Sequence, residues 1–249
     1  MAEKLKYSPL IEALCEFRFV PSSSWDWTIP GRLYAEIGKE FPERAQVEGL
    51  AVQLVLGREK TSAQPVTRGT ERVQMKRADG AAMVQVGPHL LVVNHLRPYT
   101  SWETFRPMIL DVYAKHERIA GPAKVARIGL RYINRIQLPD SGCRLEEFTT
   151  LDPHLTGVLD RPLNGMYQRF ELAQEKPKAI LVVQVGTQGS KEEGSFMMLD
   201  FDIGSPPDQE FSDKQSVESW LNDAHERVDD AFFAAVATPL LEKFRRGES

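Results

Sequence analysis

Three arginines recur at every fourth position of one strand-like segment. They are Arg127, Arg131 and Arg135, within residues 124–138. Alternate side chains of an extended strand share a face, so the three guanidinium groups project from one side, about 13 Å apart. Guanidinium forks match the oxygens of carboxylates and phosphates. The spacing therefore predicts a cationic stripe for an anionic ligand, a peptide or a nucleic acid, unless acidic side chains neutralise it.

Acidic side chains with the required spacing occur on two other expected strands. Glu12 and Glu16 share one face of the first strand, and Asp200 and Asp202 share one face of the last. Either pair, on a strand beside the arginines, would form cross-strand ion pairs. Because these partners are present, ion pairing is favoured over a binding role, and both interpretations stay open. The candidate residues for ligand or partner binding are Arg127, Arg131, Arg135, Glu12 and Glu16.

Asp200 and Asp202 also raise the question of a metal site. Two carboxylates on one strand face can hold Mg²⁺, as they do in phosphoryl-transfer sites. A nuclease or phosphohydrolase would need further acids and usually a nearby lysine, and no such set follows at a telling spacing. Metal chemistry is therefore the weaker alternative, and no cofactor is expected.

Familiar catalytic motifs are missing from the sequence. None of the five histidines has a spacing typical of zinc sites, and neither a glycine-rich phosphate loop nor the Gly-x-Ser-x-Gly elbow occurs. His225 lies beside an apolar helical stripe near Trp220, which is typical of a half-buried histidine at a packing seam. We therefore expect a protein that is not an enzyme.

Charge and cysteine usage narrow the class further. The chain has 31 basic and 35 acidic residues and a formal charge of -4, which gives no overall field for nucleic acid or anionic lipid. Cys15 and Cys143 lie in ordinary segments and suit free thiols in a reducing compartment. The sequence shows neither a signal peptide nor a membrane-spanning apolar run. The expected location is cytoplasmic, with nucleic-acid binding disfavoured.

Hydrophobic periodicity predicts the elements that carry these side chains. The expected strands are residues 10–20, 50–56, 72–77, 82–95, 124–138, 165–174, 178–187 and 195–203. The expected helices are residues 25–41, 101–120, 143–150 and 212–244, the last bent near Thr238 and Pro239. Two polar loops, residues 58–72 and 188–194, form a second candidate surface for a partner.

The order of elements suggests an internal repeat. Residues 1–121 and 122–249 each have a strand, a helix, antiparallel strands and a final helix. We expect an α+β fold in which two similar halves form one pseudo-duplicated compact unit, with helices on one face of antiparallel sheets. The midpoint at Gly121 and Pro122 is too short for a flexible linker. A free sheet edge would also allow a homodimer.

Three segments resemble a known family. They are Tyr7–Phe19, Gly129–Ile136 and Trp220–His225, followed by Phe232 and Thr238. Together they are similar to a sporadically distributed family of uncharacterised bacterial proteins of roughly this length. The resemblance covers nearly the whole chain and brings no established activity. It implies a patchily inherited bacterial gene, a pattern common among defence and toxin–antitoxin systems.

Three functions follow, in decreasing order of preference. The first is a non-enzymatic binding or regulatory protein that recognises a protein partner, in a defence or toxin–antitoxin context implied only by the resemblance. The second is a protein that binds a small anionic ligand in a pocket lined from both halves, with the arginine face near its mouth. The third is the metal-dependent nuclease or phosphohydrolase.

Overall fold

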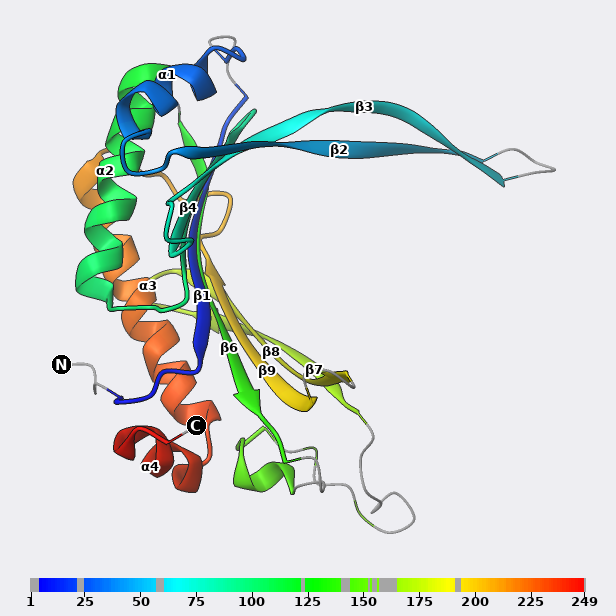
Figure 1. Ribbon diagram of the computed structural model, residues 1–249, viewed down its shortest axis with the longest axis vertical. Helices are drawn as coiled ribbons and strands as arrows, with labels where there is room; N and C mark the ends of the chain where they lie inside the picture. Colours follow the sequence, from blue (N-terminus) through cyan, green and yellow to red (C-terminus); the bar gives the residue numbers. More distant parts are fainter. Residues whose placement is uncertain are drawn as a thin grey trace.

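One antiparallel sheet of nine strands runs through the protein, and the helices lie on one of its faces (Figure 1). The computed structural model describes residues 5–21, 25–56, 61–121, 124–139, 144–151, 153, 156, 165–190 and 194–248, without the side chains of 49–70 and 190. The strands are β1 Leu10–Phe19, β2 Glu43–Leu56, β3 Thr61–Lys76, β4 Ala82–Gly87, β5 Leu90–Leu96, β6 Val125–Gln137, β7 Tyr167–Gln174, β8 Ala179–Ser190 and β9 Gly194–Gly204. Their order in the sheet is β2-β3-β4-β5-β1-β6-β9-β8-β7.

The helices cover the apolar face that the strand periodicity creates. They are α1 Ile29–Ile37, α2 Trp102–Ala120, α3 Lys214–Ala235 and α4 Thr238–Arg246, with a short 3-10 turn, η1, at Leu145–Glu147. On β1, Ala13, Cys15 and Phe17 are fully buried toward α2 and α3, whereas Glu12 and Glu16 project to the other face. This second face, which carries no helix from the described residues, is called the open face below.

Local capping and proline chemistry set the ends of the last helices. The Asp213 carboxylate accepts a hydrogen bond from the Ser216 backbone N–H at 2.7 Å, which caps the start of α3. The chain leaves the helix at Val236 and begins α4 with Pro239 in the first turn. The single bent helix expected over 212–244 is therefore two helices, and the chain is extended at Val236 and Ala237, just before the expected bend.

The expectation of two similar halves is wrong, although the α+β class is confirmed. The sheet is continuous across the midpoint, because β1 pairs with β6, with Cys15 opposite Leu130. Four strands follow α1 where three were expected. The helix expected at 143–150 is only the three-residue η1 within the described residues. Periodicity identifies elements one at a time and does not encode which strands pair. The division into 1–121 and 122–249 stays a prediction.

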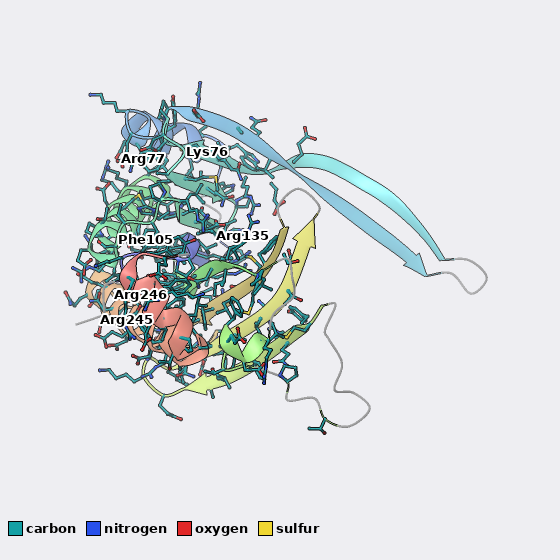
Figure 2. All side chains as sticks on the ribbon, turned by 60° about the horizontal axis from the view of Figure 1, so that its bottom comes forward. Lys76, Arg77, Phe105, Arg135, Arg245 and Arg246 are labelled. Carbon is teal, nitrogen blue, oxygen red and sulfur yellow. The ribbon has the colours of Figure 1, made fainter. Side chains whose placement is uncertain are left out.

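Much of the loop expected at 58–72 is strand. β2 and β3 form a long hairpin that extends away from the rest of the sheet, and residues 61–72 belong to β3 (Figures 1 and 2). Of the second expected loop, β8 covers residues up to Ser190 and β9 begins at Gly194. Residues 191–193 lie outside the described residues, as does Cys143.

Two further features concern the cysteine and the helices. Cys15 is a free, buried cysteine, and burial raises the pKa of its thiol well above the usual value. The thiol is therefore protonated at neutral pH and packs as an apolar side chain. No helix in the described part of the chain has the length and apolar character needed to cross a membrane.

Candidate functional site

The open face brings together most of the charged residues singled out in the sequence. β6 lies between β1 and β9, so its side chains are flanked by the acids of both neighbouring strands. Leu14 on β1 is opposite Arg131, which in turn is opposite Asp202 on β9. Both acidic pairs considered in the sequence analysis therefore flank the arginine strand.

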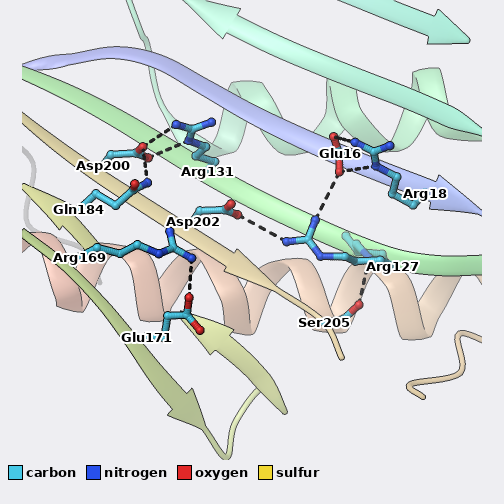
Figure 3. A network of polar contacts seen from close by, with 11 residues as sticks. Glu16, Arg18, Arg127, Arg131, Arg169, Glu171, Gln184, Asp200, Asp202 and Ser205 are labelled. Carbon is cyan, nitrogen blue, oxygen red and sulfur yellow. Dashed lines mark hydrogen bonds and ion pairs between the residues drawn. The ribbon is translucent and has the colours of Figure 1, made fainter. Parts of the chain in front are cut away.

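Arg131 and Asp200 form a fork-to-fork ion pair at the centre of this face (Figure 3). The Nε and Nη2 groups of Arg131 donate to the two carboxylate oxygens of Asp200 at 2.8 and 2.5 Å. Gln184 on β8 donates a third hydrogen bond to this carboxylate at 3.1 Å. Asp200 is only 8% exposed, and its hydrogen bonds offset the loss of water. The bond to Asp200 also raises the pKa of Arg131.

Arg127 lies between two acids farther along β6 (Figure 3). Its Nη1 is 3.3 Å from Glu16 Oε1, and its Nη2 is 3.8 Å from Asp202 Oδ1. Burial raises the pKa of Asp202, and the nearby arginines oppose this shift. A Cβ atom on Gly204 would lie 2.2 Å from Arg127 Nη2. Gly204 is therefore the residue that lets the guanidinium lie flat over β9.

Arg135 has an aromatic contact. Its guanidinium lies over the Phe196 ring, 4.0 Å from the ring centroid. Arg127 and Arg131 thus form the ion pairs that were favoured in the sequence analysis, and Arg135 packs on an aromatic ring. A role of these residues in binding stays a prediction.

Amide side chains extend the polar contacts across the other half of the sheet. Gln74 donates to Gln85 at 3.1 Å, Gln85 donates to Asn94 at 3.0 Å, and Asn94 donates to Glu12 at 2.6 Å. In this series of three hydrogen bonds, each amide N–H₂ donates in the direction of the Glu12 carboxylate, so each bond polarises the next. Gln85 and Asn94 are 7% and 1% exposed, and the chain supplies partners for these buried amides.

The two sets of contacts meet at the centre of the sheet. Glu12 and Arg131 attract each other, and this contributes to the raised pKa of Arg131. At the far end, Tyr167 on β7 donates its hydroxyl hydrogen to Gln184. We call these eight residues the polar row, and they lie on eight of the nine strands: Gln74, Gln85, Asn94, Glu12, Arg131, Asp200, Gln184 and Tyr167.

A second polar cluster lies on the helix side of the sheet. Tyr132 Oη is 3.0 Å from His225 Nδ1 on α3 and 3.4 Å from Tyr99 Oη. The Trp102 ring stacks on His225 with centroids 4.4 Å apart. Tyr99, Tyr132, His225 and Trp102, with Asp229 one turn after His225, are called the Tyr–His cluster below.

Burial determines the protonation of the Tyr–His cluster. It raises the pKa of Tyr99 to about 12 and lowers the pKa of His225 to about 4. Burial, with a smaller repulsion from Asp230, raises the pKa of Asp229 to about 6. At neutral pH His225 is therefore neutral, so one of its ring nitrogens carries a hydrogen and the other is an acceptor. The tautomer determines whether Nδ1 accepts the hydrogen bond from the Tyr132 hydroxyl or donates it.

Sequence reasoning placed His225 at a packing seam but missed its partner. Tyr132 and His225 are 93 positions apart, so no spacing rule connects them. The signal that existed was the strand alternation, which directs Tyr132 to the face opposite Arg131. The amide half of the polar row also went unnoticed, because glutamine and asparagine on a strand carry no distinctive pattern.

The structure groups no metal ligands around the two aspartates. Among the described residues, no three His, Cys, Asp or Glu side chains are close enough to hold a metal ion. Asp200 is engaged by Arg131 and Gln184. A metal bound there would have to displace these hydrogen bonds.

Comparison with known proteins adds no assignment. No protein-family model matches this chain, and no curated protein has a significantly similar sequence. The family resemblance therefore stays a prediction, and proposals about function rest on the geometry of the two faces.

Proposed function

We propose that this protein is a non-enzymatic binding protein that recognises a protein partner with the open face of its sheet. The observation that supports the proposal is the polar row, which crosses eight strands on the face that the described helices leave uncovered. Its side chains are held in place by one another before any partner arrives. Binding by prearranged groups loses less side-chain entropy, so more of the contact energy appears as affinity.

The size of the row favours a macromolecular partner over a small ligand. Eight adjacent strands span about 34 Å at about 4.8 Å per strand. Gln85, Asn94 and Asp200 are buried, so a partner would contact the other five members, Gln74, Glu12, Arg131, Gln184 and Tyr167, which still span this width. The width matches a typical protein interface of about 800 Å² per partner. A small anion would contact only a few of these side chains, and the acids beside Arg127 and Arg131 already offset their charge. The small anionic ligand is therefore the second choice.

The centre of the row indicates the chemistry of the partner. Among the described residues, Glu12 accepts one hydrogen bond, from Asn94, although a carboxylate has about four acceptor positions. The Arg131 guanidinium beside it engages Asp200 through Nε and Nη2. An acceptor and a donor side by side complement a neutral amide, such as a main-chain peptide group or an Asn or Gln side chain. A neutral polar patch is thus the expected epitope.

The remaining expectations keep their lower rank. The hydrogen bonds that engage Asp200 weigh against the metal-dependent nuclease or phosphohydrolase, in which Asp200 and Asp202 would be ligands. The neighbouring acids likewise disfavour nucleic acid. The cytoplasmic location rests on the sequence, and the defence or toxin–antitoxin context rests on the resemblance.

The proposal is tested by a comparative pull-down from the native host. Leu14 projects from the open face beside Arg131 and takes part in none of the row's hydrogen bonds. Leu14→Lys places a bulky charge between Glu12 and Glu16 in the middle of the face. Ala35→Lys on the exposed surface of α1 is the matched control. Circular dichroism melting verifies that both variants fold.

We expect one protein to be retained in stoichiometric amount by the wild type and by Ala35→Lys. Leu14→Lys should lose roughly tenfold or more of it, because a charge at the centre of an interface is strongly unfavourable. Equal retention by both variants, or no stoichiometric partner at all, would count against the open face as the binding surface.

A further inference from the structure

The outer edge of β7 is not paired with any strand of the described residues. β7 is the last strand in the sheet order, and none of its residues is buried, whereas all six of β4 are. Among the described residues, six large hydrophobic side chains are exposed, and four of them are on β7 or the neighbouring β8. These four are Tyr167 at 66%, Phe170 at 39%, Leu172 at 46% and Ile180 at 43% exposure. Exposed apolar residues on an uncovered edge strand are typical of a strand-pairing surface.

The hydrogen-bond pattern shows which backbone groups of β7 point outward. The Met166 carbonyl accepts a hydrogen bond from the Thr187 N–H of β8 at 3.0 Å. Inward and outward groups alternate along an antiparallel strand. Residues 168, 170 and 172 therefore bond to β8, and residues 167, 169, 171 and 173 direct their N–H and C=O groups to the free edge. Another strand can pair with these four residues.

We infer that this edge pairs with β7 of a second copy of the chain, antiparallel, about a two-fold axis at Phe170. In this register Arg169 is opposite Glu171 of the second copy, and Glu171 is opposite its Arg169. Both residues project to the open face, where they are 44% and 60% exposed and contact each other at 2.6 Å. Pairing would give each charge a partner across the interface. The outward backbone groups of residues 169 and 171 face each other at the same time.

Other registers lack this self-complementarity. A two-fold axis at residue 169 would place Arg169 opposite Arg169 of the second copy, and an axis at residue 171 would place Glu171 opposite Glu171 of the second copy. Like charges directly opposite on paired strands are unfavourable. The axis at Phe170 also uses nearly all of β7, which runs from Tyr167 to Gln174.

The same register covers the exposed apolar side chains. On the helix side, Phe170 faces Phe170 of the second copy, and the two Leu172 side chains lie diagonally beside this pair. On the open side, Tyr167 of one copy is opposite Ala173 of the other, and Ala173 lies beside Ile180 on β8. Tyr167, Phe170 and Leu172 therefore gain an apolar neighbour from the second copy, and Ile180 lies one strand behind the interface.

The opposite edge of the sheet is built differently. β2 has two register shifts in its pairing with β3, near Val47 and Ala51. Bulges of this kind bend an edge and discourage pairing. β7 pairs with β8 without such a shift. The two edges therefore differ in the register shifts that discourage association.

A two-fold axis through β7 is perpendicular to the sheet, because the joined strands are antiparallel. The open faces of the two copies would point the same way, with the Tyr167 ends of the two polar rows on opposite sides of the axis. The pairing itself does not depend on the proposed partner-binding function, since it follows from the edge alone.

Charge reversal tests the register. Light scattering or analytical ultracentrifugation should give the wild type a mass of twice 28.2 kDa. Arg169→Glu and Glu171→Arg should each weaken the dimer roughly tenfold or more, because each sets two pairs of like charges opposite one another. The double variant restores both pairs and should dimerise like the wild type. The two single variants, mixed in equal amounts, should form a heterodimer.

A monomeric wild type at the highest soluble concentration would overturn the inference. So would a dimer that both single variants leave unchanged, because its interface would lie elsewhere. Circular dichroism shows whether each variant is folded, and the double variant and the mixed sample separate loss of pairing from misfolding.

Discussion

The polar row and the Tyr–His cluster lie on opposite faces of β6, and they compensate for the burial of polar groups in different ways. Arg131 on β6 projects to the open face, and the next residue, Tyr132, projects to the helix side. In the polar row, charge meets opposite charge or an amide donor. In the Tyr–His cluster, neutral groups share hydrogen bonds and burial shifts the pKa values. The charges of the polar row are paired or hydrogen-bonded, whereas the Tyr–His cluster contains groups whose protonation changes between pH 4 and pH 6.

Acidification should give the largest difference between the two faces, because it should destabilise the contacts on the helix side. His225 and His116, both on the helix side, have a pKa of about 4 because of burial. His116 stacks on Phe19 at 4.9 Å, and within the described part of the chain neither of its ring nitrogens has a hydrogen-bond partner. The unfolded chain binds protons at both histidines near pH 6.5, and the folded chain does not until near pH 4. The free energy of unfolding should therefore fall by on the order of 3 kcal/mol per histidine as the pH is lowered from 6.5 to 4.

Urea unfolding at pH 7 and pH 5 measures the part of this loss that occurs above pH 5, on the order of 2 kcal/mol per histidine. His116→Phe keeps an aromatic ring against Phe19 and removes one titrating group, so its stability should fall less steeply with pH. If the free energy of unfolding changes equally with pH in the wild type and in His116→Phe, His116 does not contribute to the pH dependence.

Removing one member of an ion pair should affect the open face at every pH where Asp200 is charged. Arg131→Met leaves the Asp200 carboxylate, 8% exposed, with only the hydrogen bond from Gln184. We expect a destabilisation of about 2 kcal/mol, below the value for a fully buried pair because Arg131 is partly exposed. Chemical denaturation at pH 7 measures it.

The double variant Arg131→Met with Asp200→Leu is the control for that measurement. Replacing both partners removes the unpaired carboxylate, so stability should return close to that of the wild type. If the double variant is as unstable as Arg131→Met, the loss of stability comes from the packing of the Arg131 side chain and not from the unpaired Asp200 carboxylate.

Neutralising the carboxylate of the Tyr–His cluster should have the smallest effect and the opposite sign. The folded-state pKa of Asp229 is raised to about 6, so its ionised form is unfavourable at pH 7. Asp229→Asn should stabilise the protein at pH 7 by about 1 kcal/mol, after allowance for solvent screening of this half-exposed group. The gain should vanish as the pH falls below 4, where Asp229 is protonated in both states.

Thermal unfolding of Asp229→Asn and Asp230→Asn, at pH 7 and at a pH below 4, measures the effect of each substitution. Asp230 is the exposed neighbour on the same helix. Equal effects of the two substitutions would indicate a general reduction of negative charge.

The sequence predicted most elements and the ion pairs, because both depend on local periodicity. Alternation placed Glu16 and Arg127 on strand faces, and the structure joins them across β1 and β6. Pairing across the sheet is not local, which is why the two expected halves proved to be one sheet. For the same reason the contact between Tyr132 and His225, from β6 to α3, had no signal in the sequence.

The position of β1 at the centre of the sheet has a consequence for synthesis. β1 is the first strand to be made, yet its neighbours are β5 and β6, with Phe19 opposite Val125. At ~5–20 residues per second, translation needs on the order of ten seconds to extend the chain from β1 to the end of β6. During that time the edge of β1 that pairs with β6 has no partner strand. The nascent chain therefore exposes this edge to a chaperone until β6 has been made.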